Sequence, residues 1–263
     1  MTEGALPFIM QEMFKIPLPF VVYIASHNLH KIEEIQQIVS TQAFTKELLA
    51  QVMALGYVCD GDALYRCSTT EAEPPLQAPT SFFSFRSIGE VAPYEAPEEN
   101  GTTYLENAKI KAEYAYHLGK GEVDVLADDS GLEVAALGGF PGIHSARFAP
   151  EEEQIPQLLE KMKDVTDPKD RGLCFHCAVA FAGHDGMGKP WEFSLERDVL
   201  GQMLTEPQGS KGFGYDPIFY LPSLEKSFAQ VPTDVKNQYS HRGKAVRAFC
   251  LAYLEGKLGH VAR

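Results

Sequence analysis

The sequence lacks several features that would place it in common functional classes. No apolar run approaches the roughly 20 residues needed to cross a bilayer, so we expect no membrane span. The formal net charge of −13 argues against a nucleic-acid partner, because affinity for a phosphate backbone comes from clustered Lys and Arg. A small nucleotide needs only a local basic pocket, so this class of ligand remains compatible with the acidic chain.

The N-terminal stretch lacks the basic start and continuous apolar segment of a signal peptide, and we expect a cytoplasmic protein. Five cysteines, an odd count, favour reduced thiols. Internal repeats and linkers between independent domains are also missing. We therefore predict a single domain over residues 1–263, with an N-terminal extension at 1–20 and an insertion at about 59–97.

Cys174 and Cys177 form a C-x-x-C pattern around His176, which raises a zinc or redox hypothesis. The surrounding residues, 173–181, have the composition of a strand, in which the two cysteines face opposite ways. We interpret both as core residues, and Cys59 and Cys67 likewise, because no second pair of ligands lies near them in the sequence.

The chain is organised around residues 125–147, where a strand-length apolar run, 123–127, stops at Asp128 and Asp129. Two acids at the end of a buried strand are costly without partners, and a hard divalent cation is a usual partner. Alternation along a strand predicts that the two carboxylates face different ways. A helix N-cap or an Asx turn is the alternative for this pattern.

Strands alternate with helices along the chain, which predicts an α/β fold with a mixed central β-sheet flanked by helices. The segment from about 59 to 97 is rich in proline, and we interpret it as lying outside the central sheet. Its aromatic patch, 82–85, predicts packing on the body or on a partner chain. The expected strands are 21–25, 173–182, 191–197 and 201–204, and the expected helices follow Lys31, Thr103, Pro150 and Lys244.

Three loops have the composition of ligand-binding loops. Residues 26–31 join a strand to a helix, whose N-terminus favours anions, although a surface Lys31 is the alternative. The glycine-containing loop 209–216 carries Phe213 and Tyr215, which are either platforms for a base or core aromatics. Donor side chains at 240–242 begin the last helix and suit an anion or a carbonyl.

Taken together, these stretches resemble the inosine triphosphate pyrophosphatase family, which hydrolyses non-standard purine nucleoside triphosphates. Five motifs match in order, although Ser26 and His27 stand where the family usually has Thr-Gly. The matching residues are Ser26-His27-Asn28 with Lys31; Glu98-Glu-Asn-Gly with Leu105-Glu-Asn-Ala and Lys111; Ala127-Asp-Asp-Ser-Gly-Leu-Glu-Val with Leu137-Gly-Gly-Phe-Pro-Gly, ending at Ser145-Ala-Arg147; Gly212-Phe-Gly-Tyr-Asp-Pro-Ile-Phe; and Lys236 with Ser240-His-Arg-Gly.

The resemblance implies two lobes with the active-site cleft between them, a homodimer, and Mg²⁺-dependent cleavage of ITP, dITP or XTP into the monophosphate and pyrophosphate. It implies Asp129 as the general base and Glu99, Asp129 and Asp128 as the groups that hold the metal. The implied substrate-binding residues are Ser26, His27, Asn28, Leu29, His30, Lys31, Lys111, Ser130, Phe213, Gly214, Tyr215, Asp216, Lys236, His241 and Arg242.

Within this set, Phe213 is expected to stack on the base, and Lys236, His241 and Arg242 to read the carbonyl edge of the purine. Donors at that edge would pair with hypoxanthine or xanthine and face an unmatched amino group in adenine, at a cost of about 1–3 kcal/mol. Two alternatives remain at this point. One is a pyrophosphatase for modified pyrimidine triphosphates, and the other is a nucleotide-binding module without turnover.

Overall fold

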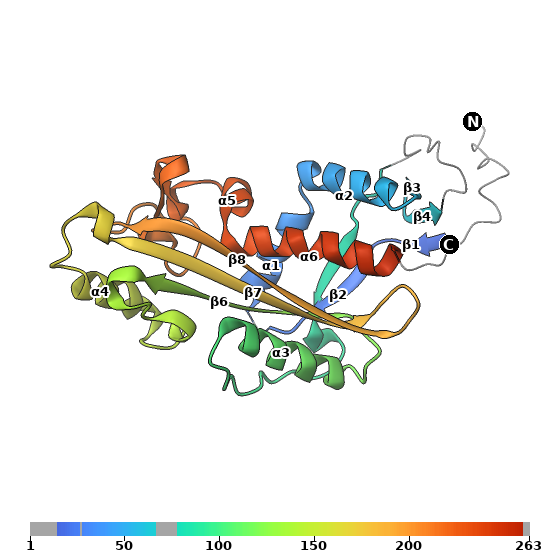
Figure 1. Ribbon diagram of the computed structural model, residues 1–263, viewed down its shortest axis with the longest axis horizontal. Helices are drawn as coiled ribbons and strands as arrows, with labels where there is room; N and C mark the ends of the chain where they lie inside the picture. The colour runs from blue at the N-terminus through green and yellow to red at the C-terminus, as the bar shows by residue number, and fades with distance from the viewer. Residues whose placement is uncertain (1–14, 27, 67–77, 260–263) are drawn as a thin grey trace.

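A computed structural model describes residues 15–26, 28–66 and 78–259, which form two β-sheets and six α-helices (Figure 1). The larger sheet has the strand order β10-β9-β8-β7-β6-β2-β5, and the smaller has the order β1-β4-β3. The strands of the larger sheet are β2 (Phe20–Ile24), β5 (Phe83–Ser87), β6 (Val125–Val134), β7 (Gly172–His184), β8 (Pro190–Met203), β9 (Phe219–Leu221) and β10 (Lys226–Ser227).

The larger sheet is mixed, as the alternation of strands and helices predicts. Strand β2 pairs in parallel with β5 and β6, whereas the pairs β6–β7, β7–β8, β8–β9 and β9–β10 are antiparallel. The smaller, antiparallel sheet contains β1 (Lys15–Pro17), β3 (Tyr57–Asp60) and β4 (Ala63–Arg66).

Helices cover both faces of the larger sheet, with α6 on one side and α3 on the other (Figure 1). Alternate residues of β6 divide between two apolar clusters: Leu126 packs with α6, and Val125 and Ala127 pack with α3. The helices are α1 (Leu29–Val39), α2 (Gln42–Ala54), α3 (Tyr104–Leu118), α4 (Glu151–Lys161), α5 (Thr233–Tyr239) and α6 (His241–Leu258). None of the helices in these described ranges is long and apolar enough to span a bilayer.

Side-chain caps fix the starts of the helices that frame the site. Asn28 caps α1 by accepting a hydrogen bond from the backbone N–H of Lys31, and Thr103 caps α3 through the N–H of Glu106. Ser240 caps α6 in the same way, through the N–H of Gly243. All three caps follow from residue types that the sequence places before a helical pattern. Helix α2, by contrast, was not among the predicted elements.

The central strand does not end at the paired aspartates, and this prediction was wrong. Strand β6 continues to Val134, with Asp128 opposite Val179 and Asp129 opposite Ala178 in β7. Both aspartates are nevertheless buried, at 3% and 8% exposure. The strand can continue because each carboxylate meets cationic side chains on its own face of the sheet, which offsets the cost of burial.

The segment at 59–97 also differs from the prediction, since part of it lies inside the central sheet. Strand β5 forms the edge of the larger sheet, and its Phe83 and Phe85 are buried in the same cluster as α6. The aromatic patch therefore packs on the body of the protein, as predicted. We did not predict β5 because the surrounding segment is rich in proline, although alternate residues of this short strand face the core.

A third correction concerns β8, which was predicted as two strands, at 191–197 and 201–204. It is one strand of 14 residues that pairs with β7 along its whole length. Gly201 interrupts the apolar pattern of the sequence, but the hydrogen-bonded pairing with β7 continues through it. A glycine is needed there because the ring of Phe219 occupies the space where a Cβ would lie.

Candidate active site

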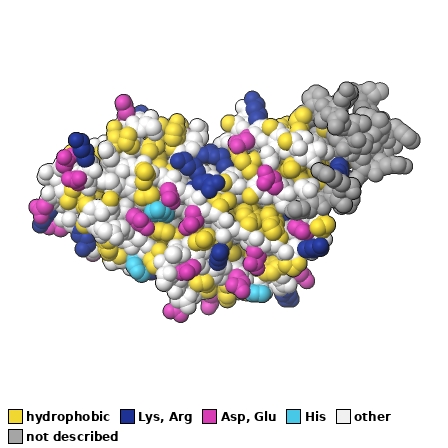
Figure 2. All heavy atoms as spheres, in the orientation of Figure 1, with side chains coloured by type: hydrophobic (Ala, Val, Ile, Leu, Met, Phe, Trp, Pro, Cys, Tyr) yellow, Lys and Arg dark blue, Asp and Glu magenta, His cyan; other side chains and the backbone are white. Residues whose placement is uncertain are grey.

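A cavity of about 380 Å³ opens where β6 and β7 meet the N-terminal ends of α1 and α6. Most of the residues predicted for substrate or metal contribute to its wall. These are Asn28, Lys31, Glu99, Lys111, Asp129, Ser130, Phe213, Gly214, Tyr215, Asp216, Lys236, His241 and Arg242. On the face seen in Figure 2, Lys and Arg side chains gather over α5 and the start of α6, with acidic side chains nearby.

Four predicted residues within the described ranges do not form part of this wall, and His27 lies outside those ranges. Ser26 accepts a hydrogen bond from the N–H of Asn28 at 3.0 Å, and thus shapes the loop rather than the cavity. Leu29 is exposed, and the side chain of His30 is exposed beside Glu33. Asp128, the fourth, is buried behind the wall and is described below.

Asp129 and Glu99 converge on one lysine. The Nζ of Lys111 lies 2.9 Å from Oδ1 of Asp129 and 2.8 Å from Oε1 of Glu99. The amide of Asn107 donates to the other oxygen of Asp129, and Arg147 donates to the other oxygen of Glu99. Helix α3 supplies both Lys111 and Asn107, four residues apart and therefore on one face.

The two carboxylates differ in their affinity for protons. Burial raises the pKa of Asp129 above its ordinary value, and the charge of Lys111 only partly opposes this. Burial alone would raise the pKa of Glu99 as well, but the hydrogen bonds from Lys111 and Arg147 bring it below its ordinary value. Two carboxylates gathered at one point of a cavity are a donor set that fits a hard divalent cation.

Asp128 faces the opposite side of the sheet and pairs with different cations. Its Oδ2 accepts from Nζ of Lys31 at 3.0 Å, from the hydroxyl of Ser130 at 3.1 Å and from the guanidinium of Arg242 at 3.3 Å. Burial would raise the pKa of this carboxyl, but Lys31 and Arg242 hold it well below its usual range. Asp128 is thus a buried anion that fixes two cations at the wall of the cavity.

The ion pairs continue from Arg242 into a buried network. Arg242 also donates to Glu34 of α1, whose other oxygen lies 3.5 Å from Nζ of Lys236. Lys236 in turn lies 2.6 Å from Asp216. Burial of these charged groups is sustainable because each has an opposite charge and hydrogen bonds at short range. The network joins β6, α1, α5, α6 and the loop before β9.

Phe213 projects from the loop before β9 and is 36% exposed. The Nζ of Lys236 lies 4.4 Å from the centroid of its ring, and the guanidinium carbon of Arg242 lies 5.6 Å from it. The loop is held by Asp216, which accepts from the backbone N–H of Phe213 at 3.0 Å. An exposed aromatic face beside fixed cations can receive a flat heterocycle that carries carbonyl groups.

Tyr215 has a different environment from Phe213, although the sequence suggested similar roles for the two. It is 7% exposed, belongs to an apolar cluster with Phe219 and Phe228, and donates its hydroxyl to the carbonyl of Ser145. Of the two interpretations weighed for these aromatics, the core residue applies to Tyr215 and the exposed platform to Phe213.

His241 is buried at the first turn of α6, where its ring stacks on Phe175 with centroids 4.5 Å apart. Burial, together with the charges of Arg242 and Lys236, lowers its pKa well below the ordinary value. Its Nδ1 has no hydrogen-bond partner among the described residues, although His241 is part of the cavity wall. A neutral imidazole with an unused ring nitrogen is available to a polar ligand group.

Several site residues escaped the sequence reasoning. Glu34 follows Lys31 by three residues and lies on the buried stripe that contains Ile35 and Ile38. A charged residue on an apolar helical stripe is a pattern that could have identified it. Asn107 and Arg147 lay inside the matched motifs without being singled out. Gly131, Ile143, Ser145, Ala146, Glu151, Gln154 and Phe175 complete the wall of the cavity.

Comparison with known proteins adds independent information. A model of the Ham1 family matches residues 70–252. A dITP/XTP pyrophosphatase from Acidobacterium capsulatum is 44% identical over 178 residues, which cover 63% of this chain and 83% of that protein. A dITP/XTP pyrophosphatase from Thermus thermophilus is 45% identical over 163 residues, which cover 61% of this chain and 75% of that protein.

Solved structures agree with the sequence comparisons. A HAM1 protein from Coxiella burnetii is 29% identical and superposes with a TM-score of 0.62, over 90% of this chain and 99% of its own. The Ham1 protein of Staphylococcus aureus is 31% identical and superposes with the same TM-score and the same coverage.

Proposed function

The chain belongs to the Ham1 family, and we propose that its cavity is the active site in which it acts as a nucleoside-triphosphate pyrophosphatase. The enzyme hydrolyses non-canonical purine nucleoside triphosphates, the activity named for its relatives that act on dITP and XTP. The single observation that supports this site best is the convergence of Asp129 and Glu99 on Lys111, in a cavity whose wall also contains the exposed ring of Phe213.

We propose that Asp129 and Glu99 hold a divalent cation, and that this cation is Mg²⁺. The cation would neutralise phosphate charge and polarise the phosphoryl oxygens. Both carboxylates keep one oxygen on Lys111, while Asn107 and Arg147 orient the remaining two. Such outer contacts set the direction of the ligand oxygens.

In the proposed reaction, a water oxygen attacks the α-phosphorus. The bond between this phosphorus and the α–β bridging oxygen breaks, and pyrophosphate leaves. Asp129 accepts the proton of the attacking water. Its raised pKa, caused by burial, gives this carboxylate a greater affinity for that proton than an exposed aspartate has. The water proton thus goes to Asp129 and the α-phosphoryl group stays on the nucleoside monophosphate, so the reaction needs no further reactant.

Lys31, which pairs with Asp128 on the other face of β6, would bind the leaving pyrophosphate. It stands in the first turn of α1, where free backbone N–H groups also favour anions. Asp128, predicted as a third metal ligand, already accepts from Lys31 and Arg242. We therefore propose that Asp128 orients these two cations. Asn28, Ser130 and Lys111 complete the proposed phosphate contacts.

For the base, we propose stacking on Phe213 and reading of the carbonyl edge by Lys236, His241 and Arg242. The side chains of Lys236 and Arg242 are held by ion pairs with Glu34, Asp128 and Asp216. Moving either of them away from an unmatched group on the base would break an ion pair. An amino group at the 6-position would leave a buried donor unpaired, which costs about 1–3 kcal/mol.

Pyrophosphate release tests this proposal, measured with inosine, xanthosine, adenosine and guanosine triphosphates in the presence and absence of Mg²⁺. We expect metal-dependent release from the first two substrates and much less from adenosine triphosphate. Equal release from all four would refute the base-reading residues. Preference for a methylated pyrimidine triphosphate would favour the alternative substrate class, and absence of release from every substrate would favour a binding module.

We also propose that residues 1–263 form one domain, that the protein is a homodimer and that it resides in the cytoplasm. The family resemblance supports the dimer, and the reduced-thiol composition supports the compartment. Sedimentation of the 29.1 kDa chain tests the second, because a single monomeric species at micromolar concentration would refute the dimer, and a single cooperative unfolding transition is the test of the first. Cell fractionation tests the third.

A further inference from the structure

Part of the predicted C-x-x-C motif belongs to a group of side chains that the proposed reaction does not use. Cys174 and His176 stand two residues apart in β7 and therefore project from the same face of the sheet. Asp198 of β8 lies directly opposite His176, and Glu133 of β6 lies directly opposite Cys174. Three neighbouring strands thus bring a thiol, an imidazole and two carboxylates together.

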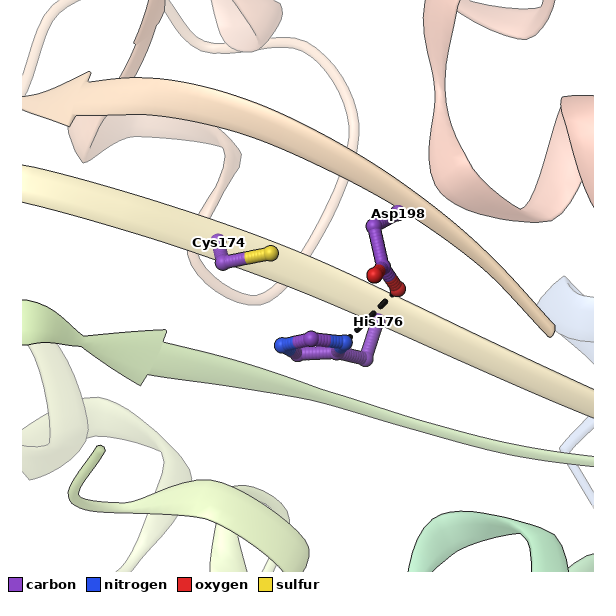
Figure 3. Close-up of side chains that lie close together, drawn as sticks. All are labelled: Cys174, His176 and Asp198. Carbon is purple, nitrogen blue, oxygen red and sulfur yellow. Dashed lines mark hydrogen bonds and ion pairs between the residues drawn. The ribbon is translucent and has the colours of Figure 1, made fainter.

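The donor atoms of Cys174, His176 and Asp198 all lie within 4.8 Å of one another (Figure 3). Nδ1 of His176 is 2.7 Å from Oδ1 of Asp198, and Nε2 is 3.2 Å from Oε2 of Glu133. Nε2 is buried and makes no hydrogen bond of acceptable geometry within the described part of the chain. Nδ1 is therefore the nitrogen that a metal shared by His176 and Asp198 would take, whereas Nε2 faces Glu133.

Cys177, the second cysteine of the motif, cannot join this group. It is buried on the opposite face of β7, in the apolar cluster that includes Val179 and Phe249 of α6. The two-cysteine zinc or redox site suggested by the sequence is therefore excluded. The structure replaces it with a different set of donors, in which the carboxylates come from the adjacent strands.

We propose that Cys174, His176 and Asp198 bind a zinc ion on the outer face of the sheet, at a site separate from the active-site cavity. Thiolate, imidazole and carboxylate are a mixed donor set that suits zinc, whereas Mg²⁺ prefers oxygen ligands alone. Zinc bonds of about 2.0–2.3 Å place tetrahedral ligands roughly 3.5 Å apart, which side-chain rotation on these fixed strands achieves. Glu133 or a water molecule takes the fourth position.

The local charge also favours a dication. Two carboxylates, Asp198 and Glu133, lie within 3.2 Å of the imidazole of His176, and their negative charge attracts a doubly charged ion. Zinc binding releases the thiol proton of Cys174 to solvent and forms the bond from zinc to sulfur in its place.

None of these side chains is part of the cavity wall, and the inference does not depend on the proposed activity. His176 does contact helix α3, because its ring stacks on Tyr104 with centroids 5.4 Å apart. Zinc at this site would fix three strands to one another beside the first turn of α3. Its expected role is structural, at the open end of the long β7–β8 hairpin.

The test is a zinc titration of the metal-free full-length protein, followed by competition with a chromophoric chelator. The protein used for the titration carries Asp129→Asn, so that zinc bound by the carboxylates of the cavity does not add to the measured stoichiometry. We expect one zinc ion per chain with submicromolar affinity. In Cys174→Ser and His176→Gln we expect binding at least about 100-fold weaker, and in Glu133→Gln about 10-fold weaker.

Matched controls separate this site from adventitious binding. Cys59→Ser removes a buried thiol elsewhere, and His184→Gln removes a half-buried imidazole near the other end of β7, so both should bind zinc as the parent does. Co²⁺ should give a thiolate charge-transfer absorption that both control variants retain and that Cys174→Ser loses. Circular dichroism verifies that each variant is folded.

Two outcomes would overturn the inference: no stoichiometric zinc binding by the parent protein, or equal binding by Cys174→Ser and His176→Gln. Because these residues lie outside the cavity, we expect Cys174→Ser to release pyrophosphate at the parental rate when Asp129 is intact. Failure of the zinc site and failure of the proposed activity are therefore distinguishable.

Discussion

Asp128 and Asp129 are adjacent in one strand, yet their carboxylates lie on opposite faces of the sheet and bind different cations. Asp129 pairs with Lys111 of α3, and Asp128 pairs with Lys31 of α1 and Arg242 of α6. The division follows from strand alternation alone. It assigns the two acids different tasks, since one carboxylate lines the cavity and the other holds cations in place behind its wall.

This relationship makes Asp129 the acid whose replacement should cost most activity. We expect Asp129→Asn to lower kcat for pyrophosphate release by about 10²–10⁴-fold, because the amide cannot accept the proton of the attacking water. Asp164→Asn is a suitable control, since Asp164 is exposed and outside the cavity. Unchanged kcat in Asp129→Asn would show that another group is the base.

Glu34 should matter for stability more than its sequence position suggests. Glu34→Gln removes the buried counter-charge that Arg242 and Lys236 share and leaves them only Asp128 and Asp216, and breaking a buried pair in this way costs about 3–5 kcal/mol. Glu33, the preceding residue, has a side chain that is 69% exposed, so Glu33→Gln should change the free energy of unfolding by less than about 0.5 kcal/mol.

Urea denaturation of the two Glu→Gln variants measures this difference directly. The prediction concerns the contrast between neighbouring positions, so errors shared by both extrapolations cancel. Equal free energies of unfolding for the two variants would mean that the network contributes no net stability.

Phe213 should contribute to substrate recognition rather than to folding. Loss of base stacking in Phe213→Ala is expected to cost about 1–3 kcal/mol, which lowers kcat/KM roughly 5- to 150-fold. Phe213→Trp preserves an aromatic face and should retain most of the activity. If Phe213→Ala kept the parental kcat/KM with inosine triphosphate, the base would bind elsewhere.

His241 makes stability depend on pH in a defined direction. Its pKa is lowered in the folded protein by burial and by the positive charges of Arg242 and Lys236, although Asp128 opposes this effect. The unfolded chain binds the proton near the ordinary value of 6.5, so the folded state is progressively disfavoured as pH falls below that value. The slope from this one residue approaches about 1.4 kcal/mol per pH unit.

Comparison of the parent with His241→Gln isolates this contribution from that of the other histidines. The difference in free energy of unfolding between the two proteins should change between pH 7 and pH 5 in favour of the variant. A constant difference across this range would mean that His241 titrates normally in the folded protein. NMR of the imidazole, which should remain neutral at pH 6, provides a second measurement.

Local patterns in the sequence were sufficient for much of the site. The sequence placed the starts of three helices close to Asn28, Thr103 and Ser240, and each of these residues caps its helix in the structure. Residue type alone did not separate Phe213 from Tyr215, because one aromatic on a loop resembles another until burial is known.

Longer-range pairing limited the rest of the prediction. Strand β6 was expected to end at Asp128 because a buried carboxylate is unfavourable when its partners are unknown, and those partners lie 97 and 114 residues away. Strand β5 was missed for a related reason: its place at the sheet edge depends on pairing with β2, more than 60 residues earlier. Neither the ion pairs of Asp128 nor the pairing of β5 with β2 can be read from residues that are neighbours in the sequence.

The buried network has a consequence for biosynthesis. Glu34 and Arg242 are 208 residues apart, so the ion pair between them cannot form until α6 leaves the ribosome. Until then Glu34 and Asp128 lack the counter-charge of Arg242, and the wall of the cavity is incomplete. A nascent chain that already carries Glu99 and Asp129 would thus have no complete cavity before α6 is made.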